Sequence, residues 1–162
     1  SGNIITSSYA VGGLVGGGYD GLISNSYSTV NIKCQNYIFI CGVGGLVASS
    51  ISLIMTDCYF AGDIELILEE NILEVYVGGL VAILQSSSTI TNCYVSGTVQ
   101  VNSEDYLQLE NLSNSFYIGG FAGRIDESVT IKNCYREGNL DVTLNLSAED
   151  KYAFSKLPAH KV

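Results

Sequence analysis

The chain has 162 residues, of which 47% are hydrophobic and 14% are charged, so it is long enough for one domain with a real core. This composition excludes a disordered tail and a highly charged coiled coil. The formal net charge of −9, with only seven basic residues, argues against nucleic acid and anionic membrane surfaces as partners, because both are bound through Lys and Arg.

The first residues, SGNIITSSYAVGG, lack the basic start and the apolar stretch of a secretion signal and resemble the second half of a repeat. We expect the chain to be a piece of something longer, so a missing signal says little about its compartment. No apolar run approaches the ~18 residues of a membrane-spanning helix, and membrane insertion is not expected.

A glycine pair with apolar neighbours recurs as VGGLVG at 11, VGGLVA at 43, VGGLVA at 77 and IGGFAG at 118. Successive copies start 32, 34 and 41 residues apart. Such glycines need either a positive φ or room for a neighbouring segment, and both alternatives stay open here, as does the facing of the apolar residues. The turn glycines are Gly12, Gly13, Gly44, Gly45, Gly78, Gly79, Gly119 and Gly120.

A second phrase follows about fourteen residues after each pair, as SNSY, TDCY, TNCY and KNCY, and an apolar-alternating run follows it, as in TVQV at 98. Three short strand-like runs per repeat, without helical periodicity, predict an all-β, right-handed parallel β-helix or β-solenoid of about four coils with three short strands per coil. The predicted solenoid domain covers residues 1–146, with coils starting near 11, 43, 77 and 118. Residues 147–162 are predicted to be a tail, linker or cap.

Stacked coils place equivalent residues one strand spacing apart, roughly 4.8 Å, so that like residues form ladders. An aliphatic ladder is predicted for Ile23, Met55, Ile90 and Ile131, and a polar ladder, interrupted by the carboxylate, for Asn25, Asp57, Asn92 and Asn133. The repeated cysteines Cys58, Cys93 and Cys134 are expected in the core. An aromatic ladder is predicted for Tyr27, Tyr59, Tyr94 and Tyr135. Its Tyr94 is treated as a core residue whose loss would cost a few kcal/mol.

Five cysteines are an odd number, so at least one has no disulfide partner in the monomer. Cys34 and Cys41 are close in sequence and lie outside the repeated phrase, and they are the preferred pair if the chain is oxidised.

Few residues suit catalysis. The single histidine, His160, lies in the predicted tail, and no C-x-x-C spacing for zinc is present. Asp63 falls at the repeat position of Thr98 and Asn139, and Glu65 and Asp141 fall at the position of Gln100. These acidic residues could form a polysaccharide-cleaving pair, a weak Ca²⁺ site or merely a wet face. The wet face is the favoured interpretation, so no cofactor is expected.

The phrase GGLV followed by ITNCYVSGTV resembles the GLUG repeat family, whose repeats occur in bacterial surface and secreted proteins, including adhesin-like proteins and immunoglobulin A peptidases. The resemblance covers residues 1 to about 144, with Ala48 and Ala82 replacing the glycine after Leu-Val and Ser26 replacing the cysteine. It implies a repetitive, extracellular, non-catalytic module and transfers no active-site residue.

We therefore expect a non-enzymatic structural or adhesive module of a larger extracellular or cell-surface protein, acting as a spacer or interaction surface. Its partner would be a protein or glycan surface ligand, or itself. The alternatives are a filament or rod subunit that stacks end to end, and a carbohydrate-binding or carbohydrate-cleaving β-helix.

Overall fold

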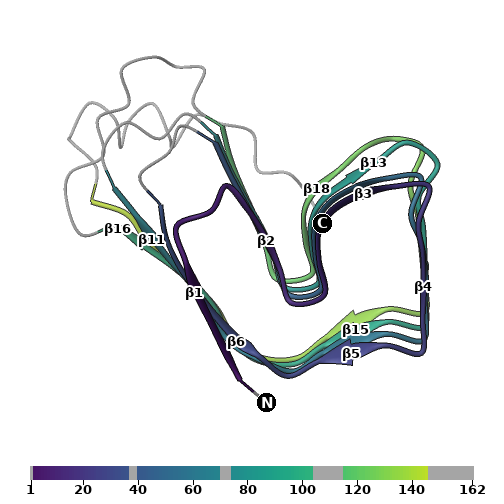
Figure 1. The fold of residues 1–162 in the computed structure, drawn as a ribbon, viewed down its shortest axis with the longest axis horizontal. Helices are drawn as coiled ribbons and strands as arrows, with labels where there is room; N and C mark the ends of the chain where they lie inside the picture. The colour runs from purple at the N-terminus through teal and green to yellow at the C-terminus, as the bar shows by residue number, and fades with distance from the viewer. Residues whose placement is uncertain (1, 37–39, 70–73, 104–114, 146–162) are drawn as a thin grey trace.

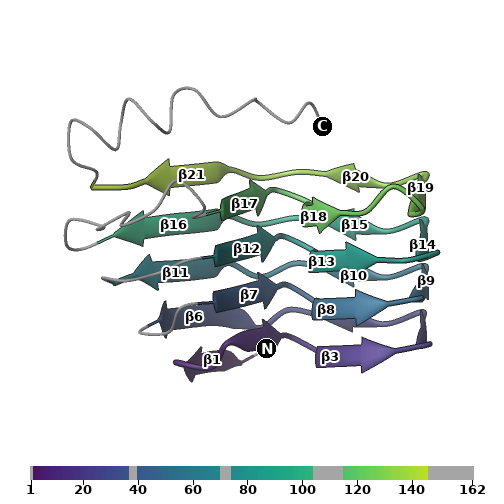
Figure 2. The same ribbon diagram turned by 90° about the horizontal axis from the view of Figure 1, so that it is seen from above.

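The computed structural model describes residues 2–36, 40–69, 74–103 and 115–145, and these residues form strands and turns without a helix. None of them therefore belongs to a helix that could cross a membrane. The strands build five parallel sheets, and each coil of the chain adds one strand to every sheet. Figure 2 shows the coils as stacked layers, so the predicted parallel β-solenoid of about four coils is confirmed. Its right-handed winding stays a prediction.

The strands follow one order in every coil. A preceding strand, β1 (Asn3–Thr6), lies ahead of the first coil. Coil 1 contains β2 (Ala10–Gly12), β3 (Val15–Tyr19), β4 (Leu22–Ser24), β5 (Tyr27–Ser28) and β6 (Asn31–Asn36). Coil 2 contains β7 (Ile40–Gly44), β8 (Val47–Ile51), β9 (Ile54–Thr56), β10 (Tyr59–Phe60) and β11 (Ile64–Leu68). Coil 3 contains β12 (Glu74–Gly78), β13 (Val81–Gln85), β14 (Thr89–Thr91), β15 (Tyr94–Val95) and β16 (Val99–Ser103). Coil 4 contains β17 (Ser115–Gly119), β18 (Ala122–Ile125), β19 (Thr130–Lys132), β20 (Tyr135–Arg136) and β21 (Leu140–Thr143).

We name the sheets by their first strands. Sheet A begins with β1 and has five strands, whereas sheets B, C, D and E begin with β2, β3, β4 and β5 and have four each. Figure 1 views the coil end on, with sheets B and C forming the two arms of a sharp bend. Each coil thus holds five strands rather than the expected three. The glycine pair divides one apparent run into two strands, and the turn at the Asn/Asp position divides another.

The first bend of each coil depends on the glycine pair. None of the eight turn glycines has a positive φ, so the alternative that holds is close approach of a neighbouring segment. A Cβ on Gly44 would overlap the Val47 carbonyl, and one on Gly45 would overlap the Gly79 carbonyl of the next coil and the Phe60 ring. In coils 2 and 3 the apolar residues on both sides of the pair face inward, since Val43, Leu46, Val77 and Leu80 are fully buried.

The second bend needs a left-handed residue. The residue before the Ser/Cys position has φ between 47° and 54° in all four coils. Asn and Asp tolerate this conformation because their short side chains can bond locally. The phrase TNCYVSG therefore encodes a strand end, a left-handed turn and a two-residue strand, and it ends at Gly97, whose φ is 120°.

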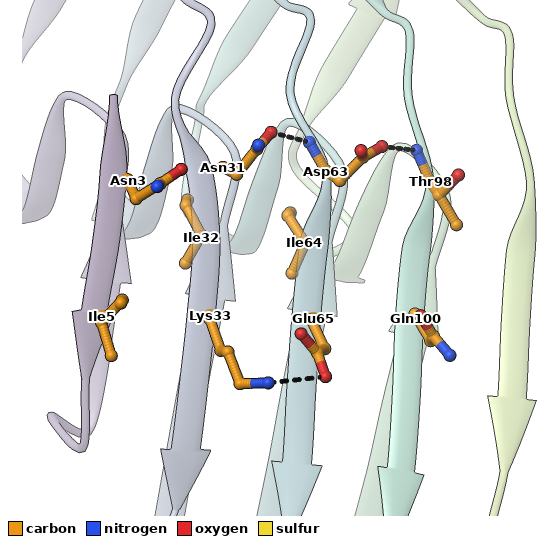
Figure 3. A pocket seen from close by; sticks show the side chains of 10 residues that line it. All are labelled: Asn3, Ile5, Asn31, Ile32, Lys33, Asp63, Ile64, Glu65, Thr98 and Gln100. Carbon is orange, nitrogen blue, oxygen red and sulfur yellow. Dashed lines mark hydrogen bonds and ion pairs between the residues drawn. The ribbon is translucent and has the colours of Figure 1, made fainter. Parts of the chain in front are cut away.

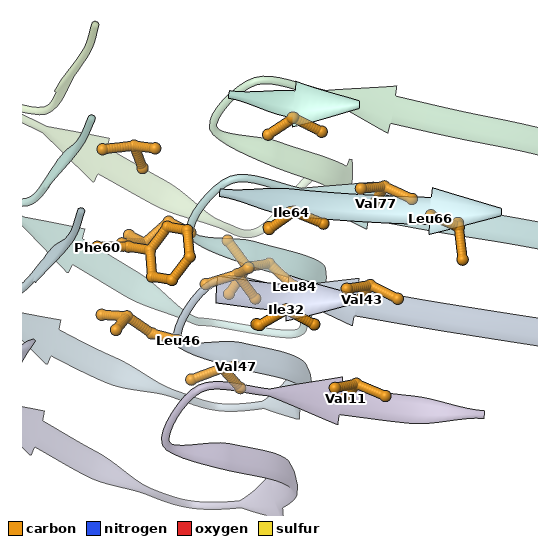
Figure 4. Packing of buried hydrophobic residues seen from close by; sticks show 14 of the residues in the cluster. Val11, Ile32, Val43, Leu46, Val47, Phe60, Ile64, Leu66, Val77 and Leu84 are labelled. Carbon is orange, nitrogen blue, oxygen red and sulfur yellow. The ribbon is translucent and has the colours of Figure 1, made fainter. Parts of the chain in front are cut away.

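The core is a set of aliphatic ladders enclosed by the five sheets (Figure 4). Val43 and Val77 are in register on sheet B, while Ile32 and Ile64 are in register on sheet A. Phe60 is the largest fully buried side chain and lies among them at 1% exposure. Met55 and Ile90 of the predicted aliphatic ladder pair directly and are fully buried, with Ile23 and Ile131 at the ends of the same row.

Candidate functional site

Four tyrosines form a row on the outer side of sheet E. The ring centroids of Tyr27, Tyr59, Tyr94 and Tyr135 lie 4.8, 4.8 and 5.3 Å apart, and adjacent rings are within 8° of parallel. The end members Tyr27 and Tyr135 are 58% and 56% exposed. The expectation that this stack lies in the core is therefore wrong. Because residues alternate across a strand, the residue after each tyrosine faces inward, as Phe60 does.

A row of polar side chains runs beside the tyrosines at the left-handed turns. The Asn133 amide donates to Asn92 Oδ1 at 3.2 Å, and the Asn92 amide donates to Asp57 Oδ1 at 3.1 Å. The Thr56 hydroxyl also donates to Asp57 Oδ2 at 2.8 Å. Asp57 thus continues the ladder as an acceptor, and the expected interruption does not occur between Asp57 and Asn133.

Acid should weaken this ladder at Asp57. Hydrogen bonds from Thr56 and then Asn92 hold the pKa of the Asp57 carboxyl below its ordinary value. A carboxyl with a lowered folded-state pKa stabilises the fold above its unfolded pKa, and this contribution is lost as pH falls through the folded pKa. We expect Asp57→Asn, which keeps the turn residue type of Asn92, to reduce the fall in melting temperature between about pH 5 and pH 2. Identical acid profiles for the two proteins would contradict this.

The repeated cysteines lie on the inner side of the same turns. Cys58 and Cys93 are buried at 1% and 0% exposure, and Cys134 is half-buried in coil 4. The Cys93 thiol lies 3.2 Å from the Thr91 carbonyl oxygen, and the Cys93 backbone N–H donates to Cys134 Sγ at 3.4 Å. Burial raises the pKa of the Cys58 thiol and raises that of Cys93 to about 12.

These thiols should differ in reactivity, because alkylation needs an accessible thiolate. We expect iodoacetamide at about pH 8 to modify Cys134 before Cys58 and Cys93 in the folded protein. In denaturant all three should react at similar rates. Peptide mass spectrometry after timed labelling measures the order, and equal labelling of Cys93 and Cys134 in the folded protein would contradict the inward position of Cys93.

Cys34 lies on β6 of sheet A in coil 1, and Cys41 lies on β7 of sheet B in coil 2. Both are buried thiols, and a side-chain hydrogen bond from Cys41 is the main cause that lowers the pKa of Cys34. The predicted disulfide stays a prediction.

A shallow groove of about 470 Å³ runs over the outer side of sheet A (Figure 3), and we call it the axial groove. Two rows of side chains line it. The first row is Asn3, Asn31, Asp63 and Thr98. The second row is Ile5, Lys33, Glu65 and Gln100. The groove therefore crosses four neighbouring strands along the solenoid axis.

Hydrogen bonds between coils order the first row. The Asp63 backbone N–H donates to Asn31 Oδ1 at 3.1 Å, and the Thr98 backbone N–H donates to Asp63 Oδ1 at 2.8 Å. In the second row, Lys33 Nζ lies 3.0 Å from Glu65 Oε1, with the two side chains 47% and 38% exposed. An exposed pair of this kind adds little stability but fixes how the two side chains lie.

Comparison with known families addresses the repeat directly. Residues 7–33 and 74–100 match the family model described as the GLUG motif. These two segments are GLUG repeats. Each spans one coil from sheet B round to the start of the sheet A strand, in coils 1 and 3. No curated protein and no solved structure matches the chain.

The acidic residues considered for catalysis lie in or directly before the sheet A strands of coils 2 and 4, and two of them have structural contacts. Asp63 accepts the Thr98 backbone N–H, and Glu65 pairs with Lys33. Asp141 is exposed and follows Gln100 in the row. Among the described residues no group of three His, Cys, Asp or Glu side chains could hold a metal ion. His160 and the predicted tail, 147–162, lie outside the described residues.

Sequence reasoning missed Lys33 and Phe60. The apolar-alternating run of coil 1 is VNI at 30–32, which ends one residue before Lys33, although Lys33 is in register with Glu65. The other coils carry Ser28, Val95 and Arg136 at the position of Phe60. Because two of these residues are polar, the sequence did not indicate that this row faces the core.

Proposed function

We propose that the chain is a non-enzymatic repeat module of a larger extracellular or cell-surface protein, which acts as a stiff spacer and offers its outer sheet A and sheet E rows as an interaction surface. The observation that carries this proposal is the unbroken pairing of equivalent strands from coil to coil in all five sheets. In coils 2 and 3 every strand is hydrogen-bonded on both sides, and backbone bonds also join the turns of adjacent coils.

The contacts of the candidate carboxylates also favour a non-enzymatic role. A glycoside hydrolase needs two carboxyl groups that flank one scissile bond and exchange protons with it. Asp63 is used to join coils and Glu65 is used to hold Lys33. The GLUG repeats support the extracellular setting that the family resemblance implies.

A length test examines the spacer role. A variant in which residues 40–103 are duplicated in tandem should gain two coils and lengthen by roughly 10 Å, since each coil adds one strand spacing. Spin labels attached near the two ends, at Tyr19 and Glu127, would report this distance by pulsed electron paramagnetic resonance. An unchanged or broadly distributed distance would overturn the stiff spacer.

An interaction test uses the chain immobilised on beads, presented to arrays of glycans and extracellular proteins and incubated in parallel with polysaccharides. Specific retention without product release is the expected result. Product formation that Asp63→Asn or Asp141→Asn abolishes would overturn the non-enzymatic role.

End-to-end assembly is a second candidate, favoured by exposed apolar side chains on coil 1. Tyr19 and Leu22 are 77% and 70% exposed on the edge strands β3 and β4. At the other end, Arg136 Nε and Nη2 are buried without a hydrogen-bond partner among the described residues, whereas buried polar groups normally have one. Electron micrographs of the concentrated chain should contain rods if this candidate holds, and a monomer at high concentration would exclude it.

A further inference from the structure

The axial groove repeats its hydrogen-bonding groups along the solenoid axis. Asn31 of β6 is matched by Asp63, the residue before β11, and Lys33 of β6 is matched by Glu65 of β11. Gln100 of β16 continues the second row. Equivalent groups in adjacent coils are roughly 4.8 Å apart. A ligand that follows the groove therefore meets similar polar groups at regular intervals, which suits a polymer better than a compact molecule.

The polar groups of the groove are held in place before any ligand arrives. The bonds from Asp63 N–H and Thr98 N–H use one oxygen each of Asn31 and Asp63. Within the described part of the chain, the Asn31 amide nitrogen and the second Asp63 oxygen remain available to bond a ligand. Side chains that are already fixed lose little conformational entropy on binding, which favours affinity at a shallow site.

The charges of the groove favour an uncharged ligand. Its charged side chains are Lys33, Asp63 and Glu65, and the one ammonium is already 3.0 Å from a carboxylate oxygen. A polyanion would have to break this pair and approach a chain with a net charge of −9. Uncharged hydroxyl groups can both donate to carboxylates and accept from amides and the ammonium.

A protein ligand fits the groove less well. Strands β6, β11 and β16 are paired on both sides, so of the four described strands in the groove β1 alone, at its end, has an open edge to which a peptide strand could be added. Protein interfaces also depend on aromatic and apolar anchors in pockets. Ile32 and Ile64 under the groove are only 1% exposed, which leaves Ile5 as the exposed apolar side chain of the lining.

We propose that the axial groove binds a linear, uncharged polysaccharide that lies along the solenoid axis, with its hydroxyl groups bonded to Asn31, Asp63, Glu65 and Gln100. This inference rests on the proposed interaction surface and names its ligand class.

Affinity electrophoresis of the whole chain through gels that contain soluble polysaccharides tests the site. Neutral linear probes are β-glucan, xylan and glucomannan, and polyanionic probes are polygalacturonate and dextran sulfate. We expect retardation by at least one neutral probe and by neither polyanion. Gln100→Ala should weaken that binding by about tenfold, the effect of one lost hydrogen bond. Glu65→Gln, which releases Lys33, should also weaken it.

The matched control is Gln85→Ala, which deletes the same side chain from β13 of sheet C, on another side of the coil (Figure 1). It should bind like the unaltered chain, and melting temperatures confirm that each variant is folded. No binding to any neutral probe, binding to polyanions alone, or equal loss in Gln100→Ala and Gln85→Ala would each overturn the proposal. The length test is independent of these results. Protein retention on the arrays, combined with no binding to any neutral probe, would keep the interaction surface while excluding this ligand.

Discussion

Replacing Phe60 by Ala is expected to lower the free energy of unfolding by about 3–5 kcal/mol, the range for large-to-small changes of aromatic core residues. Phe60 is 1% exposed, and its ring lies directly against the backbone of Gly45 and Gly62. These glycines belong to rigid bends, so the walls of the cavity cannot move inward to fill it. Chemical denaturation monitored by circular dichroism gives the free energy and the midpoint.

The comparison variant is Tyr94→Ala, one coil further on and on the outer side of the same sheet. Tyr94 stacks on Tyr59 and Tyr135 at 4.8 and 5.3 Å, and each stacked pair contributes about 0.5–1.5 kcal/mol. We expect a loss of about 1–2 kcal/mol, because the ring remains partly in contact with water in the folded protein. A loss as large as that of Phe60→Ala would contradict the difference in facing.

The coil-to-coil register could be predicted from the sequence because one phrase recurs at nearly constant spacing. Once TDCY and TNCY are aligned, Met55 must pair with Ile90 and Tyr59 with Tyr94, as they do. Facing was harder to predict, because Cys and Tyr are both residues that cores accept. The left-handed residue interrupts the alternation of inward and outward side chains just before a strand of only two residues. Two residues are too few to show a period-two hydrophobic pattern in the sequence.

The number of strands per coil and the axial groove could not be predicted from the sequence, for related reasons. A bend at Gly44 and Gly45 interrupts no apolar pattern, since Val43 and Leu46 on its two sides are both fully buried. The groove depends on cross-coil bonds such as Thr98 N–H to Asp63, which join residues 35 apart in sequence. The sequence showed only that these polar residues fall at equivalent repeat positions. That alignment could not decide whether they form a catalytic pair, a cation site or a wet face.

Gly45→Ala should cost ~3 kcal/mol or more, at or above the upper end of the usual cost of overpacking a core. The added methyl group would overlap the Gly79 carbonyl of coil 3 and the Phe60 ring. The Gly79 carbonyl belongs to the same bend one coil further on, so it cannot withdraw without opening the stack. Thermal unfolding should show a large fall in melting temperature or a failure to fold.

Gly42→Ala is the matched control, three residues before Gly45 on β7 and likewise buried. A Cβ there meets the nearest atoms at 3.8 and 3.9 Å, which is ordinary contact, and the equivalent residue of coil 1 is Ala10. We expect its free energy of unfolding to change by less than about 1 kcal/mol. The double variant Gly45→Ala/Phe60→Ala separates the two overlaps, because removing the ring leaves the Gly79 carbonyl in place. A double variant as stable as Phe60→Ala alone would show that the ring, and not the close approach of successive bends, requires glycine at this position.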